Sequence, residues 1–208
     1  MIHLEDGLAS RQFHCSDSKK NIFIIGDSIC LGYYDVVKES LSSVAEVFSV
    51  GENCRNTQYV ITNLNTWANM FADPTKVDVV QFNCGHWDVA RWYGGEYSLT
   101  SEDEYGKNIQ LIISAISQLF PNAKIVFATT TTMNPNGQKA LNHRTNSDIE
   151  RYNHIAKEVA EKNNMEINDL YAITKAWDST MYSDYCHFTE EASKRLGRMV
   201  ADGLKLFL

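Results

Sequence analysis

A serine, an aspartate and a histidine stand at positions where they could form a nucleophilic catalytic set. Ser28 closes the Gly-Asp-Ser tripeptide at 26–28, which directly follows the apolar run at 22–25, and Asp184 and His187 are three residues apart. A serine hydroxyl becomes a good nucleophile only when an imidazole accepts its proton, and the imidazole needs a carboxylate to fix its tautomer. The three residues therefore predict acyl-transfer chemistry, with Ser28 as nucleophile, His187 as base and Asp184 orienting the base.

The other histidines suit the role of base less well. His154 lies within a predicted helix, whereas His86 and His143 lie in two irregular segments of the chain. We expect His86 to contact substrate, and it is the alternative donor if a further side chain is needed to stabilise an oxyanion.

Acyl transfer also needs hydrogen-bond donors for the oxyanion of the tetrahedral intermediate. Gly51 follows an apolar segment at 45–50, and Asn83 follows another at 77–82. If both segments are strands of one parallel sheet, the backbone N–H of Gly51 and the amide of Asn83 lie at the same edge as Ser28. That edge is where ligands bind in open parallel sheets.

Short apolar runs alternate with longer segments of helical period, which is the pattern of β-α-β units around a parallel sheet. The predicted strands span 21–26, 45–50, 77–82, 124–129 and 165–169, and the predicted helices span 29–42, 57–71, 102–120, 148–163 and 189–205. Two helix starts match the capping-box spacing, at Ser101 with Glu104 and at Ser147 with Glu150. The sequence thus predicts one layered α/β domain.

Two irregular segments, 84–100 and 130–146, each follow the carboxyl end of a predicted strand and are expected to form pocket walls. Their aromatic rings and polar groups suit a sugar, whose apolar face stacks on a ring while its hydroxyls form hydrogen bonds. The residues expected to contact substrate are Asp27, Arg55, His86, Trp87 and Arg144, with Trp92, Tyr93 and Asn142 in the same loops.

Composition excludes several classes of protein. A formal net charge of −7 disfavours a nucleic-acid partner, and no apolar segment approaches the roughly 20 residues that cross a bilayer. Five cysteines without C-x-x-C spacing disfavour a disulfide framework or a finger-type zinc site. We expect no metal, no cofactor, no membrane partner and a cytoplasmic location; the sequence carries no signal for an oligomeric state.

The ordered blocks resemble the SGNH, or GDSL-type, family of esterases and lipases. The first block is Ile24 to Ser28, the second supplies Gly51, the third runs from Asn83 to Asp88, and the last from Asp184 to His187. The third block departs from the common G-x-N-D pattern and matches an N-x-G-x-x-D variant, which favours Asn83 as the family asparagine.

The resemblance implies a three-layer, flavodoxin-like α/β fold, with a five-stranded parallel sheet of order 2-1-3-4-5 and helices on both faces. It implies Ser28, His187 and Asp184 as the catalytic triad, and the Ser28 N–H, the Gly51 N–H and the Asn83 amide as the oxyanion hole. We expect residues 1–20 to be an N-terminal extension and residues 21–208 to be a single hydrolase domain.

The predicted function is hydrolysis of a short-chain ester, acetyl above others, of a carbohydrate or related small molecule through an acyl-enzyme. Two enzymatic alternatives use the same triad, a lysophospholipase and an acyl-thioesterase. A carbohydrate-binding module that retains the fold without turnover is the non-enzymatic alternative. A thiol-based metal or redox protein built on Cys30, Cys54, Cys84 and Cys186 is the least favoured alternative.

Overall fold

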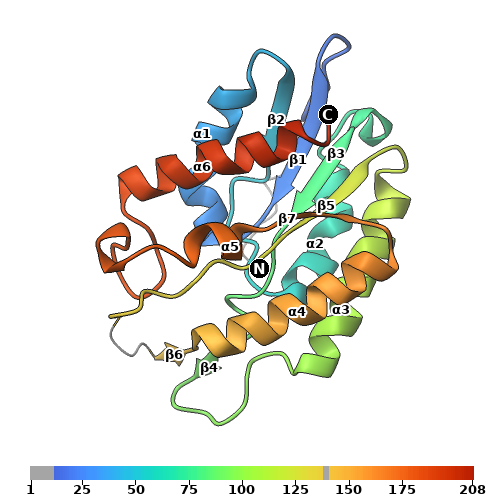
Figure 1. Cartoon of the computed structure of the whole chain (residues 1–208). Helices are drawn as coiled ribbons and strands as arrows, with labels where there is room; N and C mark the ends of the chain where they lie inside the picture. The colour runs from blue at the N-terminus through green and yellow to red at the C-terminus, as the bar shows by residue number, and fades with distance from the viewer. Residues whose placement is uncertain (1–11, 138–140) are drawn as a thin grey trace, which may run out of the picture.

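Five parallel strands form the centre of the protein, as the computed structural model of residues 12–137 and 141–208 shows (Figure 1). The strands are β1 (Lys20–Ile25), β2 (Ala45–Ser49), β3 (Val79–Phe82), β5 (Lys124–Ala128) and β7 (Glu166–Asn168). Their order in the sheet is β2-β1-β3-β5-β7, and every pairing is parallel. Numbered as five strands, this is the predicted order 2-1-3-4-5, so the predicted fold class is confirmed.

Helices cover both faces of the sheet (Figure 1). One layer holds α1 (Ser28–Leu41) and α6 (Glu190–Lys205), which pack on each other, and the other layer holds α2 (Thr57–Ala68), α3 (Glu102–Leu119) and α4 (Asn146–Lys162). The shorter elements are α5 (Leu170–Thr174), the 3-10 turns η1 (Pro74–Lys76) and η2 (Ser179–Met181), and the two-residue strands β4 (Arg91–Trp92) and β6 (Asn142–His143).

Strand β1 shows why the sequence makes a three-layer fold. Side chains alternate across a strand, so Ile22 and Ile24 pack in the apolar cluster that also holds α1 and α6 residues. Phe23 and Ile25 pack in the cluster on the opposite face, with α2 and α3. A strand buried on both faces is apolar throughout, which explains the uninterrupted run that precedes Gly26.

The start of α4 corrects one predicted helix boundary. Thr145, not Ser147, is the N-cap: its hydroxyl accepts the Asp148 N–H, and the Asp148 carboxylate accepts the Thr145 N–H. Ser147 and Glu150 have the capping-box spacing but lie inside the helix. Asp148 also forms ion pairs with Arg91 and Arg151, so the two-residue shift is stabilised by charges that the local pattern does not contain. The Ser101 cap is confirmed.

A buried carboxylate joins the 84–100 loop to the start of α2. Asp88 accepts hydrogen bonds from the Thr57 N–H (3.1 Å), the Thr57 hydroxyl (2.6 Å) and the Thr100 hydroxyl (2.9 Å). Burial raises the pKa of Asp88 to about 6, although the Thr57 and Thr100 hydrogen bonds act in the opposite direction. The loop that follows β3 is therefore fixed to the start of α2.

The described part of the predicted N-terminal extension packs on the domain. Phe13 exchanges backbone hydrogen bonds with Met70 and Ala72, and its ring contacts Phe48 and Phe71. Residues 1–11 of that extension lie outside the described residues, and the predicted domain boundary stays a prediction. No helix in the described part of the chain has both the length and the apolar character needed to cross a membrane.

Candidate active site

Ser28 is the first residue of α1 and stands where β1 turns into that helix. Asp27 caps the helix, because its side chain accepts the Ile29 N–H at 2.9 Å. A Cβ on Gly26 would lie 2.5 Å from the Cβ of Cys30, so only glycine lets the helix pack this closely against the strand end. The turn places the Ser28 hydroxyl beside the unpaired N–H groups of the first helical turn, which favour negative charge.

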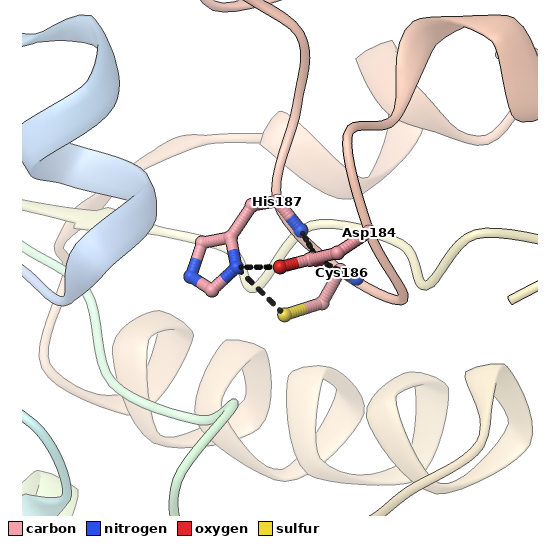
Figure 2. A group of neighbouring side chains, drawn as sticks. All are labelled: Asp184, Cys186 and His187. Carbon is pink, nitrogen blue, oxygen red and sulfur yellow. Dashed lines mark hydrogen bonds and ion pairs between the residues drawn. The ribbon is translucent and has the colours of Figure 1, made fainter. Parts of the chain in front are cut away.

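The three predicted triad residues are hydrogen-bonded in series. The Ser28 Oγ lies 2.8 Å from the His187 Nε2, and the His187 Nδ1 lies 2.7 Å from the Asp184 Oδ2. The other carboxylate oxygen, Oδ1, accepts the backbone N–H groups of Cys186 (2.8 Å) and His187 (2.7 Å). Figure 2 shows the Asp184 carboxylate and the Cys186 sulfur on the Nδ1 side of the imidazole. The carboxylate thus fixes the ring so that Nε2 faces the serine.

The loop that carries this pair is closed by its own hydrogen bonds. Tyr182 and Phe188 form a bridge pair, and the Ser183 N–H donates to the His187 carbonyl at 2.8 Å. Thr189 then caps α6. The imidazole is therefore positioned by a short loop anchored to the start of α6.

The pKa values of His187 and Asp184 both differ from their usual values. The Cys186 sulfur, 3.7 Å from Nδ1, and the Asp184 carboxylate raise the pKa of His187 to about 9, while partial burial lowers it. Partial burial raises the pKa of Asp184, but its hydrogen bonds from Cys186 and His187 outweigh burial and hold that pKa below its usual value. Asp184 is thus ionised at neutral pH and stabilises the imidazolium that forms when His187 accepts a proton.

His86 is buried and lies in the loop that follows β3. Its Nε2 is 3.0 Å from the Thr131 hydroxyl, and burial, followed by the charges of Arg144 and His187, holds the pKa of His86 well below the usual value. The preceding glycine, Gly85, has a φ of +156°, and a Cβ there would lie 2.0 Å from the Thr130 hydroxyl. The glycine in the third block therefore allows the loop to pass close to Thr130 and to bury a neutral histidine.

A small cavity of about 40 Å³ opens beside the serine. Its walls come from α1, the loop after β3, the β6 region and the 184–187 loop. The lining residues are Ser28, Ile29, His86, Trp87, Asn142, Arg144, Tyr185, Cys186 and His187. Three of the residues expected to contact substrate, His86, Trp87 and Arg144, thus lie around the nucleophile.

The two loops expected to form pocket walls are held together by a pairing that was not predicted. Strands β4 and β6 are antiparallel, with Arg91 opposite His143 and Trp92 opposite Asn142. The Trp87 and Trp92 rings lie 5.5 Å apart, and the Trp92 and Tyr93 rings 6.2 Å apart, so aromatic rings run from the cavity to the exposed Tyr93. The pairing fixes Trp92 and Asn142 relative to each other.

The predicted oxyanion donors are less completely assembled. The Gly51 N–H donates to the Ser49 hydroxyl at 3.3 Å, and Gly51 is exposed. The Asn83 amide is buried and donates to the Ala128 carbonyl at 2.7 Å, which leaves one amide hydrogen for another acceptor. Asn83 does not line the cavity beside the serine; it lies in a closely packed region that shares Ile29 with that cavity.

Two residues expected to contact substrate do not line the cavity. Asp27 is 1% exposed and acts as a helix cap. Arg55 is exposed and its guanidinium stacks on the Tyr59 ring at 4.7 Å. Conversely, Tyr185 and Cys186 line the cavity and were not predicted to contact substrate; their position inside the Asp184–His187 segment was the signal that could have identified them.

Asp184, Cys186 and His187 also offer a carboxylate, a thiol and an imidazole within 4.8 Å of one another. Such a donor set can hold a divalent ion. In this geometry, however, the His187 Nδ1 and the Asp184 carboxylate are joined by a short hydrogen bond, which is the arrangement that a catalytic base requires. The four-cysteine cluster of the least favoured alternative receives no support, because the group with metal-ligand spacing among the described residues contains one cysteine, Cys186.

A parallel sheet with a serine, a histidine and an aspartate in series at its carboxyl edge is an arrangement found in hydrolases that cleave esters. The sequence model of the GDSL-like Lipase/Acylhydrolase family matches residues 24–195. The chain belongs to this family and is a carboxylic ester hydrolase. No curated protein sequence gives a significant match.

Solved structures share the fold over most of the chain. A lipase/acylhydrolase from Enterococcus faecalis has a TM-score of 0.69 at 20% identity, with 89% of this chain and 95% of that chain covered. The acetyl xylan esterase AlAXEase has a TM-score of 0.67 at 20% identity, covering 89% and 98%. Est24, a carbohydrate acetylesterase from Sinorhizobium meliloti, has a TM-score of 0.70 at 14% identity, covering 91% and 100%. Identities this low establish a common fold.

Proposed function

We propose that this protein is a serine esterase that removes an acetyl group from a carbohydrate or a related small alcohol. The observation that carries the proposal is the hydrogen-bonded series from Ser28 through His187 to Asp184. It supplies a nucleophile, a base in reach of the hydroxyl proton, and a carboxylate that fixes the base.

In the proposed reaction, the Ser28 Oγ attacks the ester carbonyl while the His187 Nε2 accepts the hydroxyl proton. His187 then protonates the oxygen of the leaving alcohol as the tetrahedral intermediate collapses to an acyl-enzyme. A water molecule, deprotonated by the same imidazole, attacks the acyl-enzyme and releases the acid and free Ser28. The reaction needs no oxidant, reductant or cofactor.

The Ser28 backbone N–H and the second amide hydrogen of Asn83 are the proposed oxyanion donors. The helix start favours negative charge at Ser28, and Asn83 keeps one donor that its bond to Ala128 does not use. Gly51 completes the proposed set only if its N–H leaves the Ser49 hydroxyl when substrate binds.

The size of the cavity supports a short acyl group. The cavity beside the serine is only about 40 Å³, and each further CH₂ of a long acyl chain needs additional apolar volume. The Trp87–Trp92–Tyr93 row and the polar Asn142 support a sugar as the alcohol. Two structural neighbours are named as acetyl esterases of carbohydrates, which agrees with this substrate class.

We further propose that the protein acts in the cytoplasm on a small-molecule or oligosaccharide ester, without a nucleic-acid or membrane partner. Five free cysteines suit a reducing compartment, and the net charge of −7 repels phosphate backbones and anionic lipid surfaces.

The test is a panel of acetylated sugars compared with p-nitrophenyl esters of graded chain length. We expect acetate release to exceed octanoate release, and Ser28→Ala to abolish hydrolysis while Ser117→Ala, on the exposed side of α3, leaves it unchanged. Undiminished hydrolysis by Ser28→Ala would refute the serine mechanism. Preference for octanoate would favour the lysophospholipase or acyl-thioesterase alternative, and sugar binding without turnover would favour the binding module.

A further inference from the structure

Arg144 is a buried cation in the wall of the proposed active site. It follows β6, is 7% exposed, and lines the same cavity as Ser28 and His187. Its Nη1 donates to the backbone carbonyl of His86, and its Nη2 lies 3.4 Å from the Tyr185 hydroxyl and 3.6 Å from the Cys186 sulfur. None of these acceptors is a carboxylate, and no described carboxylate forms an ion pair with Arg144.

Two buried nitrogens in this wall have no hydrogen-bond partner among the described residues. They are the Nε of Arg144 and the Nδ1 of His86. A guanidinium has five N–H donors, and burying a charge without enough acceptors is costly. The Arg144 Nε–H is thus a buried donor without an acceptor, and the His86 Nδ1 is also a donor when its Nε2 accepts the Thr131 hydroxyl proton.

Neither nearby carboxyl group, Asp184 or Asp27, forms an ion pair with Arg144. Asp184 is hydrogen-bonded to His187. Asp27 is close enough for Arg144 to favour its ionised form, but burial dominates and raises the pKa of Asp27, and its Oδ2 is also unpaired. His86 adds no positive charge, because its pKa is held well below the usual value by burial and by Arg144.

The geometry points to an anion-binding subsite, in which Arg144 and His86 bind a carboxylate on the alcohol part of the substrate. The inference rests on the proposed function, since an acetyl group brings no charge of its own and the charged group must therefore belong to the alcohol. The substrate class is an acetyl ester of an acidic sugar. A guanidinium pairs with a carboxylate through parallel N–H···O bonds, and Arg144 has an unpaired N–H available for this purpose.

The experiment compares mono-O-acetyl glucuronate with mono-O-acetyl glucuronamide, two sugars of the same shape that differ in charge. We expect kcat/KM for acetate release to be at least about tenfold higher for the glucuronate, as a charge-assisted hydrogen bond gives. Arg144→Gln should reduce this ratio to about twofold or less, and Arg144→Lys, which keeps the charge, should retain part of it. Arg198→Gln, an exposed change on α6, is the charge-matched control and should keep the full ratio.

Equal rates for the two esters in the wild-type enzyme would overturn the inference while leaving the proposed function intact. An unchanged ratio in a folded Arg144→Gln protein would overturn it as well. If neither ester is hydrolysed, release of acetate from p-nitrophenyl acetate tests the proposed function separately, and calorimetry decides the subsite: tighter binding of glucuronate than of glucuronamide supports it, and equal binding refutes it. The ratio of kcat/KM for the two esters is measured within each protein, so a general loss of activity in a variant does not change it. If Arg144→Gln does not fold, Arg144→Lys still tests the inference.

Discussion

Asparagine at position 184 should impair catalysis more than alanine does, although asparagine is the closer replacement in shape. In the structure, the Asp184 Oδ1 accepts two backbone N–H groups, from Cys186 and His187, and Oδ2 accepts the imidazole Nδ1–H. An asparagine must turn its only oxygen toward the two backbone donors. Its NH₂ group then faces Nδ1 and can only donate to it.

That amide selects the tautomer with the proton on Nε2, which cannot accept the Ser28 proton. Alanine removes the carboxylate without imposing a tautomer, and water can enter because His187 and Asp184 side chains are 37% and 44% exposed. In the alanine variant, the loss of one charge-assisted hydrogen bond costs about 1.5–3 kcal/mol, or roughly 10- to 150-fold in kcat/KM. Because both side chains are partly exposed to water, we expect a loss near the lower end of this range. Holding the base in the wrong tautomer costs about 10³- to 10⁴-fold. Asp184→Asn should therefore be about tenfold or more slower than Asp184→Ala.

The assay is kcat/KM for hydrolysis of p-nitrophenyl acetate at fixed pH, with circular dichroism and thermal melting to confirm folding. Asp178→Asn is the matched control, because Asp178 caps η2 with a similar pair of hydrogen bonds away from His187. Equal activities of the two Asp184 variants, or a faster Asn variant, would show that the two backbone donors do not set the orientation of the amide.

The remaining predictions concern the catalytic base His187 and the loop at 84–100. Cys186→Ala should move the acidic limb of the pH profile of kcat/KM to lower pH, because the sulfur helps to raise the pKa of His187 to about 9 and the base acts in its neutral form. The activity near pH 7 should rise as a result. An acidic limb that stays in place or moves to higher pH contradicts this role of Cys186. Asp88→Ala should lower the free energy of unfolding by about 1–3 kcal/mol, because the buried Thr57 N–H loses its acceptor. The Thr57 and Thr100 hydroxyls can still donate to the Gln58 Oε1, which lies 3.3 Å and 3.2 Å away. Urea denaturation measures this change, and a loss below about 1 kcal/mol would be inconsistent with the buried hydrogen bonds.

The sheet, the turn that carries Ser28 and the Asp184–His187 pair could be predicted because their signals are local. An apolar run without alternation indicates a strand buried on both faces, and the ends of parallel strands meet at one edge whatever the loops do. The Asp184–His187 spacing likewise lies within one short loop. Such features depend on residues that are neighbours in the sequence.

The missing details depend on contacts between distant segments. The β4–β6 pairing joins residues about 50 positions apart, and Arg144 enters the cavity because it reaches the carbonyl of His86. The hydrogen bond from Gly51 to Ser49 depends on the conformation of the loop. Glycine allows several conformations, so its presence in the sequence does not predict which one forms. The start of α4 was misplaced because Thr145–Asp148 and Ser147–Glu150 both fit the local pattern, and the ion pair from Arg91 to Asp148 favours the first.

The closed loop from Tyr182 to Phe188 has a consequence for protein engineering. Its bridge pair and internal hydrogen bonds, together with hydrogen bonds from Asn134 to the carbonyls of Asp184 and Tyr185, hold an aspartate and a histidine in working geometry. Functional groups on a rigid element with supporting hydrogen bonds are the ones that survive transfer to another scaffold. This seven-residue segment could therefore be transferred to the start of a helix in another protein. There it would place an oriented imidazole opposite a serine at the edge of an unrelated sheet.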